Sequence, residues 1–91
     1  MDVRIWSSSN GTLPLLLVNA SRKQGRAVIR NRFRRRVRMA FLHLLRSDPD
    51  LTPFGGIVWV RPSRGARLGC DIPYAEIADQ LSLALCRWKA R

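Results

Sequence analysis

The sequence predicts an α+β fold, a two-layer sandwich in which helices pack on a small sheet and the elements follow in the order β-β-α-β-α. Apolar residues recur at helical spacing in two long segments, at about 27–46 and about 74–89. Three shorter segments are rich in β-branched, aromatic or other large apolar residues, which is typical of strands. A chain of 91 residues, of which 46% are hydrophobic, is expected to form one domain over residues 1–91.

A turn signal separates the first two predicted strands. The side chains of Val3–Ser7 alternate between an aliphatic face and a face that carries Arg4 and Trp6. The apolar character of Leu13–Ala20 indicates a buried strand. Between these segments, Ser8–Gly11 contains an Asn-Gly pair, which strongly favours a tight hairpin turn. The two strands are therefore expected to pair with each other as a hairpin.

Two helices complete the predicted fold, and a third strand at Ile57–Val60 lies between them. The first helix extends from about Ala27 to Arg46 and ends at Asp48–Pro49, because the residue before a proline disfavours helical dihedrals. Its apolar stripe consists of Ile29, Phe33, Val37, Ala40, Phe41, Leu44 and Leu45. The second helix extends over about Tyr74–Lys89, with Pro73 suited to its first turn. Its apolar stripe consists of Ile77, Leu81, Ala84, Leu85 and Trp88.

Charge is the most unusual property of the sequence. There are 17 Lys and Arg residues against 6 Asp and Glu, which gives a formal net charge of +11 and a pI near 11.7. Only Lys23 and Lys89 are lysines, and arginine is favoured where a planar fork must grip phosphate. From Val3 to Ser47 there are eleven basic residues and no acidic residue. Such an excess on a small domain predicts a polyanionic partner, either nucleic acid or an anionic membrane.

The basic residues are concentrated on the first predicted helix. Five arginines lie within the seven residues Arg32–Arg38, and no Asp or Glu stands three or four positions away to neutralise them. Like charges at this spacing destabilise an isolated helix, so an external polyanion is the simplest source of counter-charge. The alternative is a basic face that is merely solvated. Such a face normally mixes charges of both signs, so the absence of acidic residues here makes this alternative weaker than a polyanionic partner.

Two other polyanions are less well supported than RNA. A basic helix lying on an anionic membrane would use its apolar stripe for lipid, but this stripe is needed to cover the sheet. A helix-turn-helix that reads DNA needs a short helix directly before its recognition helix. The preceding segment here is Leu-Leu-Leu-Val, which predicts a strand. A helix beside a sheet favours contact with a folded RNA through phosphates and shape.

Few residues could carry chemistry. His43 is the only histidine and falls within the first helix, where a surface or boundary position is expected, and without a C-x-x-C pair no zinc site is predicted. Cys70 and Cys86 are expected to be reduced and structural, because no secretory signal accompanies them. Leu13–Val18 is too short for a signal sequence or for a membrane span. The sequence therefore predicts a cytoplasmic protein without catalytic side chains or metal ligands.

The segment Lys23–Arg38 closely resembles the RNR motif of the bacterial ribonuclease P protein subunit. Its matching positions are Lys23, Gly25, Ala27, Val28, Arg30, Asn31, Arg32, Arg34, Arg35 and Arg38. The resemblance extends over about residues 3–91, where Ile57–Pro62 is similar to the family's third strand and Tyr74–Ala90 to its last helix. Phe33 stands where the family has an aliphatic residue. The chain starts inside the first strand, so we expect it to lack the family's usual N-terminal helix, as a natural short form or a truncated one.

The resemblance implies a detail of the fold and a function. The fold detail is a left-handed β-α-β crossover, against a rule that has very few exceptions. The function is that of the accessory protein in an endoribonuclease whose RNA subunit, with Mg²⁺, removes the 5′ leader from precursor tRNA. The protein would be a monomer within this ribonucleoprotein and would supply neither a nucleophile nor a base.

Two RNA-binding surfaces follow from the charge and the resemblance. The motif helix and the loop before it would hold the catalytic RNA through Arg22, Lys23, Arg26, Arg30, Asn31, Arg32, Arg34, Arg35 and Arg38. The sheet face would form a cleft for the single-stranded leader, in which aromatic side chains stack on bases. Trp6 stands where the family often has a strand aromatic in that cleft, and simple core packing is its alternative role. Trp59 and Trp88 fit apolar periodicity and are expected in the core.

Two other functions remain open at this point. A ribosomal or other structural RNA-binding protein would have the same charge and a similar fold. A DNA-binding regulator would share the charge and belongs to a different class. Acceleration of leader removal by the chain would separate ribonuclease P from both.

Overall fold

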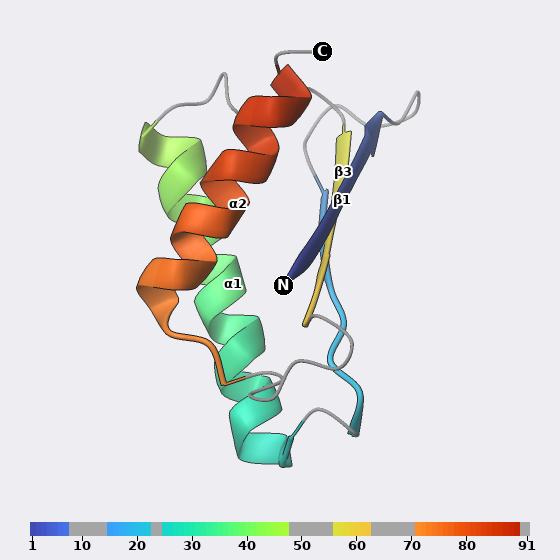
Figure 1. The fold of residues 1–91 in the computed structure, drawn as a ribbon, viewed down its shortest axis with the longest axis vertical. Coiled ribbons are helices and arrows are strands. Elements are labelled where there is room, and N and C mark those ends of the chain that lie inside the picture. The colour runs from blue at the N-terminus through green and yellow to red at the C-terminus, as the bar shows by residue number, and fades with distance from the viewer. Residues whose placement is uncertain (8–14, 23–24, 48–55, 63–70, 90–91) are drawn as a thin grey trace.

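The computed structural model describes residues 1–7, 15–22, 25–47, 56–62 and 71–89. Three strands and two helices follow in the predicted order β-β-α-β-α, which confirms the α+β fold class (Figure 1). The elements are β1 (Asp2–Ser7), β2 (Leu15–Val18), α1 (Ala27–Ser47), β3 (Gly56–Arg61) and α2 (Tyr74–Lys89). Both helices begin at the predicted residue. The predicted turn at Ser8–Gly11 lies outside the described residues.

The strand order of the sheet is β1-β3-β2, so the predicted hairpin between the first two strands is wrong. β1 pairs with β3 in antiparallel orientation, with Asp2 opposite Arg61. β2 pairs with β3 in parallel orientation, with Leu15 opposite Ile57. β3 is therefore the central strand, with Val58 and Val60 buried on one face and the half-buried Ile57 and Trp59 on the other. A turn signal indicates where the chain reverses, but it does not decide which strand becomes the neighbour.

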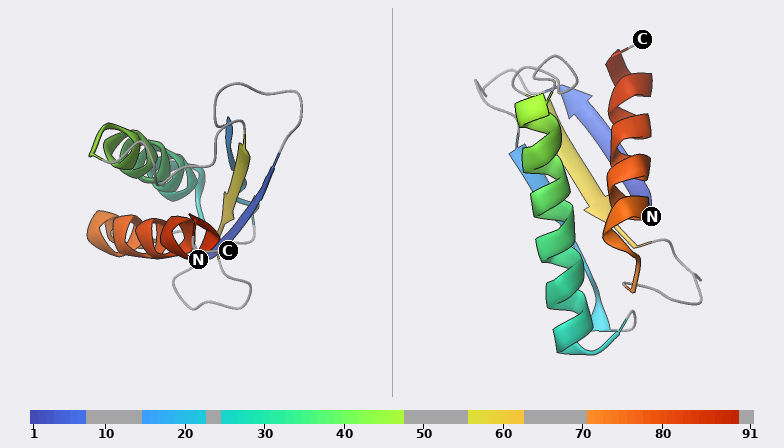
Figure 2. Two further views of the ribbon diagram at one scale, coloured as in Figure 1. Left: turned by 90° about the horizontal axis from the view of Figure 1, so that it is seen from above. Right: turned by 90° about the vertical axis from the view of Figure 1, so that its left-hand side faces the viewer.

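Both helices lie on the same side of the sheet, so that the molecule has two layers (Figure 2). α1 lies against β2 and α2 lies against β1, while the two helices also contact each other. α1 joins β2 to β3, and because these strands are parallel neighbours the three elements form a β-α-β unit. The left-handed crossover stays a prediction from the family resemblance.

The core lies between the two layers and is built from the predicted stripes. Phe33 is 0% exposed. The phenylalanine ring, which replaces the aliphatic side chain of the resembled motif, is therefore fully buried. The core residues on α1 are Phe33, Val37, Ala40 and Phe41. Those on β3 and α2 are Val58, Val60, Ile77, Leu81 and Leu85. Ile29, Leu44 and Leu45 pack against this cluster at its border, as the helical periodicity predicts.

A glycine sets the start of α1. Gly25 has a φ of +147°, a conformation that side chains with a Cβ rarely adopt, and an added Cβ would lie 3.4 Å from Cγ2 of Ile29. The N–H of Arg30 donates to the carbonyl of Arg26 at 2.9 Å. Glycine at this position therefore allows the chain to enter the motif helix with a positive φ.

The face of the sheet that is turned away from the helices has no helix over it among the described residues, and we call it the open sheet face. Its members, by strand alternation, are Asp2, Arg4, Trp6, Leu15, Leu17, Ile57, Trp59 and Arg61. Trp59 lies on this face because side chains alternate along a strand and its neighbours Val58 and Val60 point into the core. Its side chain is half-buried. Trp88 is half-buried on α2. Neither tryptophan belongs to the core cluster, so the expectation that both are core residues is wrong.

Candidate nucleic-acid interface

The solvent side of α1 carries exposed polar and basic motif residues, which we call the motif face. Because Phe33, Val37 and Phe41 point into the core, the opposite side of α1 points outward. The motif face consists of Asn31, Arg32, Arg35 and Arg38, all of which are exposed. The first turn of α1 contains no acidic residue, and within the described ranges no carboxylate forms an ion pair with the helix. Among the described residues, these cations therefore have no internal counter-charge.

Two other arginines of α1 are tied to the protein itself. Arg34 donates to Oδ1 of Asn31 at 3.2 Å and to the carbonyl of Ala20 at 3.3 Å. Arg36 donates to the carbonyl of Ile72 at 2.7 Å. Arg34 thus fastens α1 to the residues after β2, and Arg36 fastens it to the segment before α2. Arg34 was predicted to contact RNA, whereas Arg36 was not.

The remaining predicted contacts differ in accessibility. Arg22 and Arg26 are exposed ahead of α1, so the basic surface continues from the motif face toward the preceding loop. Lys23 lies outside the described residues. Arg30 is half-buried, and its Nε is buried without a hydrogen-bond partner. Arg30 is therefore less accessible to a ligand than its neighbour Asn31.

A second group of cations surrounds an aromatic ring on the open sheet face. The guanidinium carbons of Arg4 and Arg61 lie 5.8 and 5.2 Å from the centroid of the Trp59 ring, within the range of cation–π attraction. Trp6 meets Trp59 edge to face, with their centroids 6.5 Å apart. Asp2 and Arg61 form an ion pair at 3.6 Å. Trp6 is 42% exposed, so it lies on the open sheet face and not in the core.

Sequence reasoning missed three members of this second group, namely Arg4, Trp59 and Arg61. The alternation of side chains along Ile57–Val60 already separated Trp59 from its valine neighbours. This local pattern did not predict which of the two faces of the sheet the helices would cover. The pairing of β1 with β3, which places Arg4 opposite Trp59, was not predicted either.

The described residues contain no group of three or more His, Cys, Asp or Glu that could hold a metal ion. His43 is exposed, as expected for a surface residue. Cys86 is an exposed free thiol on α2, not a packed structural residue, and Cys70 lies outside the described residues. Among the helices described, none is both long and apolar enough to cross a membrane.

Comparison with known proteins decides between the kinds of RNA binder that this geometry allows. A family model described as ribonuclease P matches residues 3–87 of the chain. The chain belongs to the ribonuclease P family. No curated protein and no solved structure matches it.

The matched range contains both basic surfaces of this ribonuclease P protein. Residues 3–87 include the motif face on α1 and the Arg4–Trp59–Arg61 cluster on the sheet. Family membership connects the chain with tRNA processing and suggests an RNA partner. The exposed arginines and the exposed tryptophan are side chains suited to such a partner.

Proposed function

We propose that this ribonuclease P protein is the accessory subunit that binds the catalytic RNA and assists Mg²⁺-dependent removal of the 5′ leader from precursor tRNA. The observation that carries the proposal is the motif face. It is a helix surface of arginines that have no counter-charge among the described residues, and it lies inside a family match over residues 3–87. The protein acts as a monomer within the ribonucleoprotein, in the cytoplasm of a bacterial cell.

The motif face holds the catalytic RNA. Arg32, Arg35 and Arg38 are exposed guanidinium groups, which bind phosphate oxygens through paired N–H donors. Arg22, Lys23, Arg26 and Arg30 extend this contact toward the loop before α1. Arg34 keeps donors beyond those used for Asn31 and Ala20, so it can position α1 and contact RNA together. Such contacts fix position and orientation and read no sequence.

The open sheet face holds the single-stranded leader. Base–aromatic stacking on Trp6 and Trp59 suits a strand of any sequence, because every base has a π-face. Arg4 and Arg61 lie beside the Trp59 ring, where they provide positive charge for the adjoining phosphates. The leader would thus contact residues of β1 and β3, which are distant in the sequence and adjacent in the sheet.

The division of labour leaves the chemistry to the RNA. Mg²⁺ bound by the RNA supplies an activated water and stabilises charge at the scissile phosphate. The side chains proposed to contact RNA are arginines, a lysine, tryptophans and an asparagine, which suit phosphates and bases better than they suit a hard divalent cation. The protein residues therefore bind and orient the RNA.

A reconstitution experiment tests the proposal. The full chain is mixed with a bacterial ribonuclease P RNA and a precursor tRNA at a low Mg²⁺ concentration, where the RNA alone acts slowly. We expect the protein to accelerate the appearance of the free leader and to bind the RNA in a salt-dependent manner. Binding without acceleration would indicate a structural RNA-binding protein, and a preference for duplex DNA would indicate a DNA-binding regulator. Either result would contradict the proposal.

A further inference from the structure

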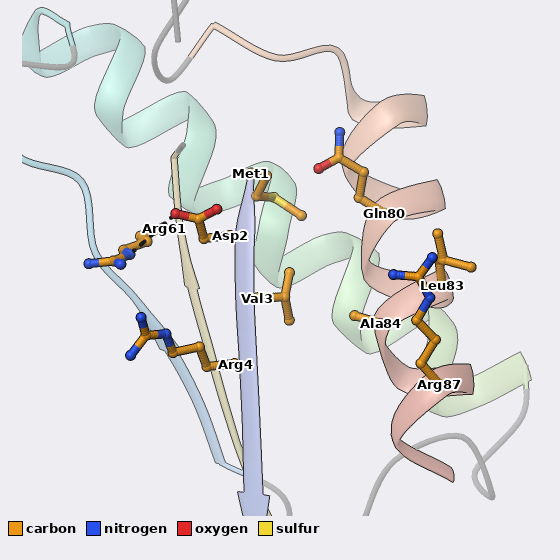
Figure 3. A pocket seen from close by; sticks show the side chains of 9 residues that line it. All are labelled: Met1, Asp2, Val3, Arg4, Arg61, Gln80, Leu83, Ala84 and Arg87. Carbon is orange, nitrogen blue, oxygen red and sulfur yellow. Dashed lines mark ion pairs between the residues drawn. The ribbon is translucent and has the colours of Figure 1, made fainter. Parts of the chain in front are cut away.

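A groove runs between the outer edge of β1 and α2, and we call it the edge groove. Two hollows of about 490 and about 480 Å³ form it. Both are lined by Val3, Arg4, Ala84 and Arg87, so they are continuous with each other. The strand order gives this edge of β1 no neighbouring strand among the described residues. Figure 3 shows one end of the groove, where Val3 points from β1 toward α2.

The edge groove carries more positive than negative charge. Arg87 borders the groove from α2. Arg4 of β1 and Arg61 of β3 lie on the side of β1 that is away from α2 (Figure 3). Asp2 is the only carboxylate among the described lining residues, and it pairs with Arg61 at 3.6 Å. Arg87 has no ion-pair partner in the part of the chain that the structure describes. Its charge is therefore available to an external anion.

Two tryptophans border the opposite end of the groove. Trp6 approaches from β1 and Trp88 from α2. Trp6 and Arg4 also belong to the open sheet face, where they lie close to Trp59. The open sheet face and the edge groove are therefore one continuous surface that passes around the edge of β1.

We propose that a single RNA strand lying on the open sheet face continues around β1 into the edge groove, where Arg87 contacts a phosphate and Trp88 contacts a base. The inference rests on the RNA-binding role proposed above and adds a second region of contact on α2. Charge favours a polyanion in the groove. Adjacent cationic and aromatic side chains match the alternating phosphates and bases of a nucleic acid, whereas an acidic peptide offers Trp88 no base to stack.

The indole N–H resonances of the full-length protein give a direct test. Its three tryptophans are assigned by single Trp→Phe variants, and an oligouridylate of about ten nucleotides, within the range of known single-strand site sizes, is then added. We expect the Trp88 resonance to shift together with those of Trp6 and Trp59. Shifts of Trp6 and Trp59 without a shift of Trp88 would overturn the inference and leave the proposed function intact.

A pair of charge variants provides the second readout. Arg87→Gln removes the groove cation, and Arg46→Gln removes an exposed arginine at the end of α1 that lines neither hollow. For the oligouridylate, the logarithm of affinity falls as the logarithm of salt concentration rises. Arg87→Gln should reduce the magnitude of this slope by about 0.7, the value for one phosphate contact with a single strand. Arg46→Gln should leave the slope unchanged.

Two further outcomes would overturn the inference. An equal loss of slope in Arg87→Gln and Arg46→Gln would indicate a general effect of net charge. An equal shift of the Trp88 resonance with oligoglutamate of matched charge would show that the groove accepts any polyanion. A chain that binds no RNA and fails the reconstitution experiment would instead remove the proposed function itself.

Discussion

The arginines of α1 and the arginines of the sheet have different surroundings. On the motif face, Arg32, Arg35 and Arg38 project into solvent from a rigid helix and have no aromatic contact that the structure describes. On the open sheet face, Arg4 and Arg61 both lie against the ring of Trp59. The first arrangement suits the phosphates of a folded RNA, and the second suits the bases and phosphates of a single strand. The same residue type thus serves two kinds of RNA contact.

The two surfaces nevertheless depend on one core. Phe33 lies within the motif segment, but it points away from the motif face and is fully buried between α1 and the sheet. The position of the motif face relative to the open sheet face is consequently fixed by packing. Variants of single residues can therefore separate the two surfaces, whereas a change in the common core should impair both.

Phe33→Ala should have the largest effect, because it leaves a cavity in the common core. We expect the free energy of unfolding in urea to fall by about 3–5 kcal/mol, which is a large share of the stability of a small domain. Binding of both structured RNA and oligouridylate should fall with it. Met39→Ala, at an exposed position of the same helix, is the control and should change stability little. Equal effects of the two variants would contradict the packing described here.

Trp59→Ala should affect the sheet surface selectively. Loss of one stacking partner should reduce oligouridylate affinity by about 1–3 kcal/mol, or roughly 5- to 150-fold, as measured by fluorescence anisotropy. The affinity for the catalytic RNA should change much less. Leu17→Ala removes an apolar side chain from the same face without removing a ring, so it serves as the matched control. If Leu17→Ala weakened binding as strongly, stacking on Trp59 would not be the cause.

Arg36→Gln and Arg35→Gln compare a tied arginine with an exposed neighbour. Arg36 donates to the carbonyl of Ile72 at 2.7 Å, so its loss should lower the free energy of unfolding by about 1 kcal/mol. Arg35→Gln should leave stability nearly unchanged and should weaken binding to the catalytic RNA. Urea denaturation and RNA titration of both variants measure these effects. The reverse result would place the RNA contact on the other flank of α1.

Arg38→Gln should have the smallest effect, confined to electrostatics. One lost phosphate contact should reduce the magnitude of the slope of log affinity against log salt by about 1 for structured RNA. Stability should be unaffected, since no internal partner of Arg38 occurs among the described residues. Arg34→Gln, in contrast, should reduce both the slope and the stability, because Arg34 also bonds the carbonyl of Ala20. An unchanged slope in Arg38→Gln would move the RNA contact away from the end of the motif.

Local features of the sequence determined the elements and the motif face. Helical periodicity predicted which side of α1 and of α2 would be buried, and it fixed the outward direction of Arg35 and Arg38. These properties depend on residues a few positions apart, and periodicity and propensity report such short-range relations reliably.

The tertiary structure alone decided the strand order and, with it, the second surface. Strand pairing depends on which segments bury the most apolar area together, and this choice involves residues far apart in the chain. It placed β3 between β1 and β2, brought Arg4 opposite Trp59, and turned Trp59 away from the core. It also gave Arg34 and Arg36 their carbonyl partners. The arginine-rich motif was visible in the sequence, whereas the aromatic and cationic sheet surface required the assembled fold.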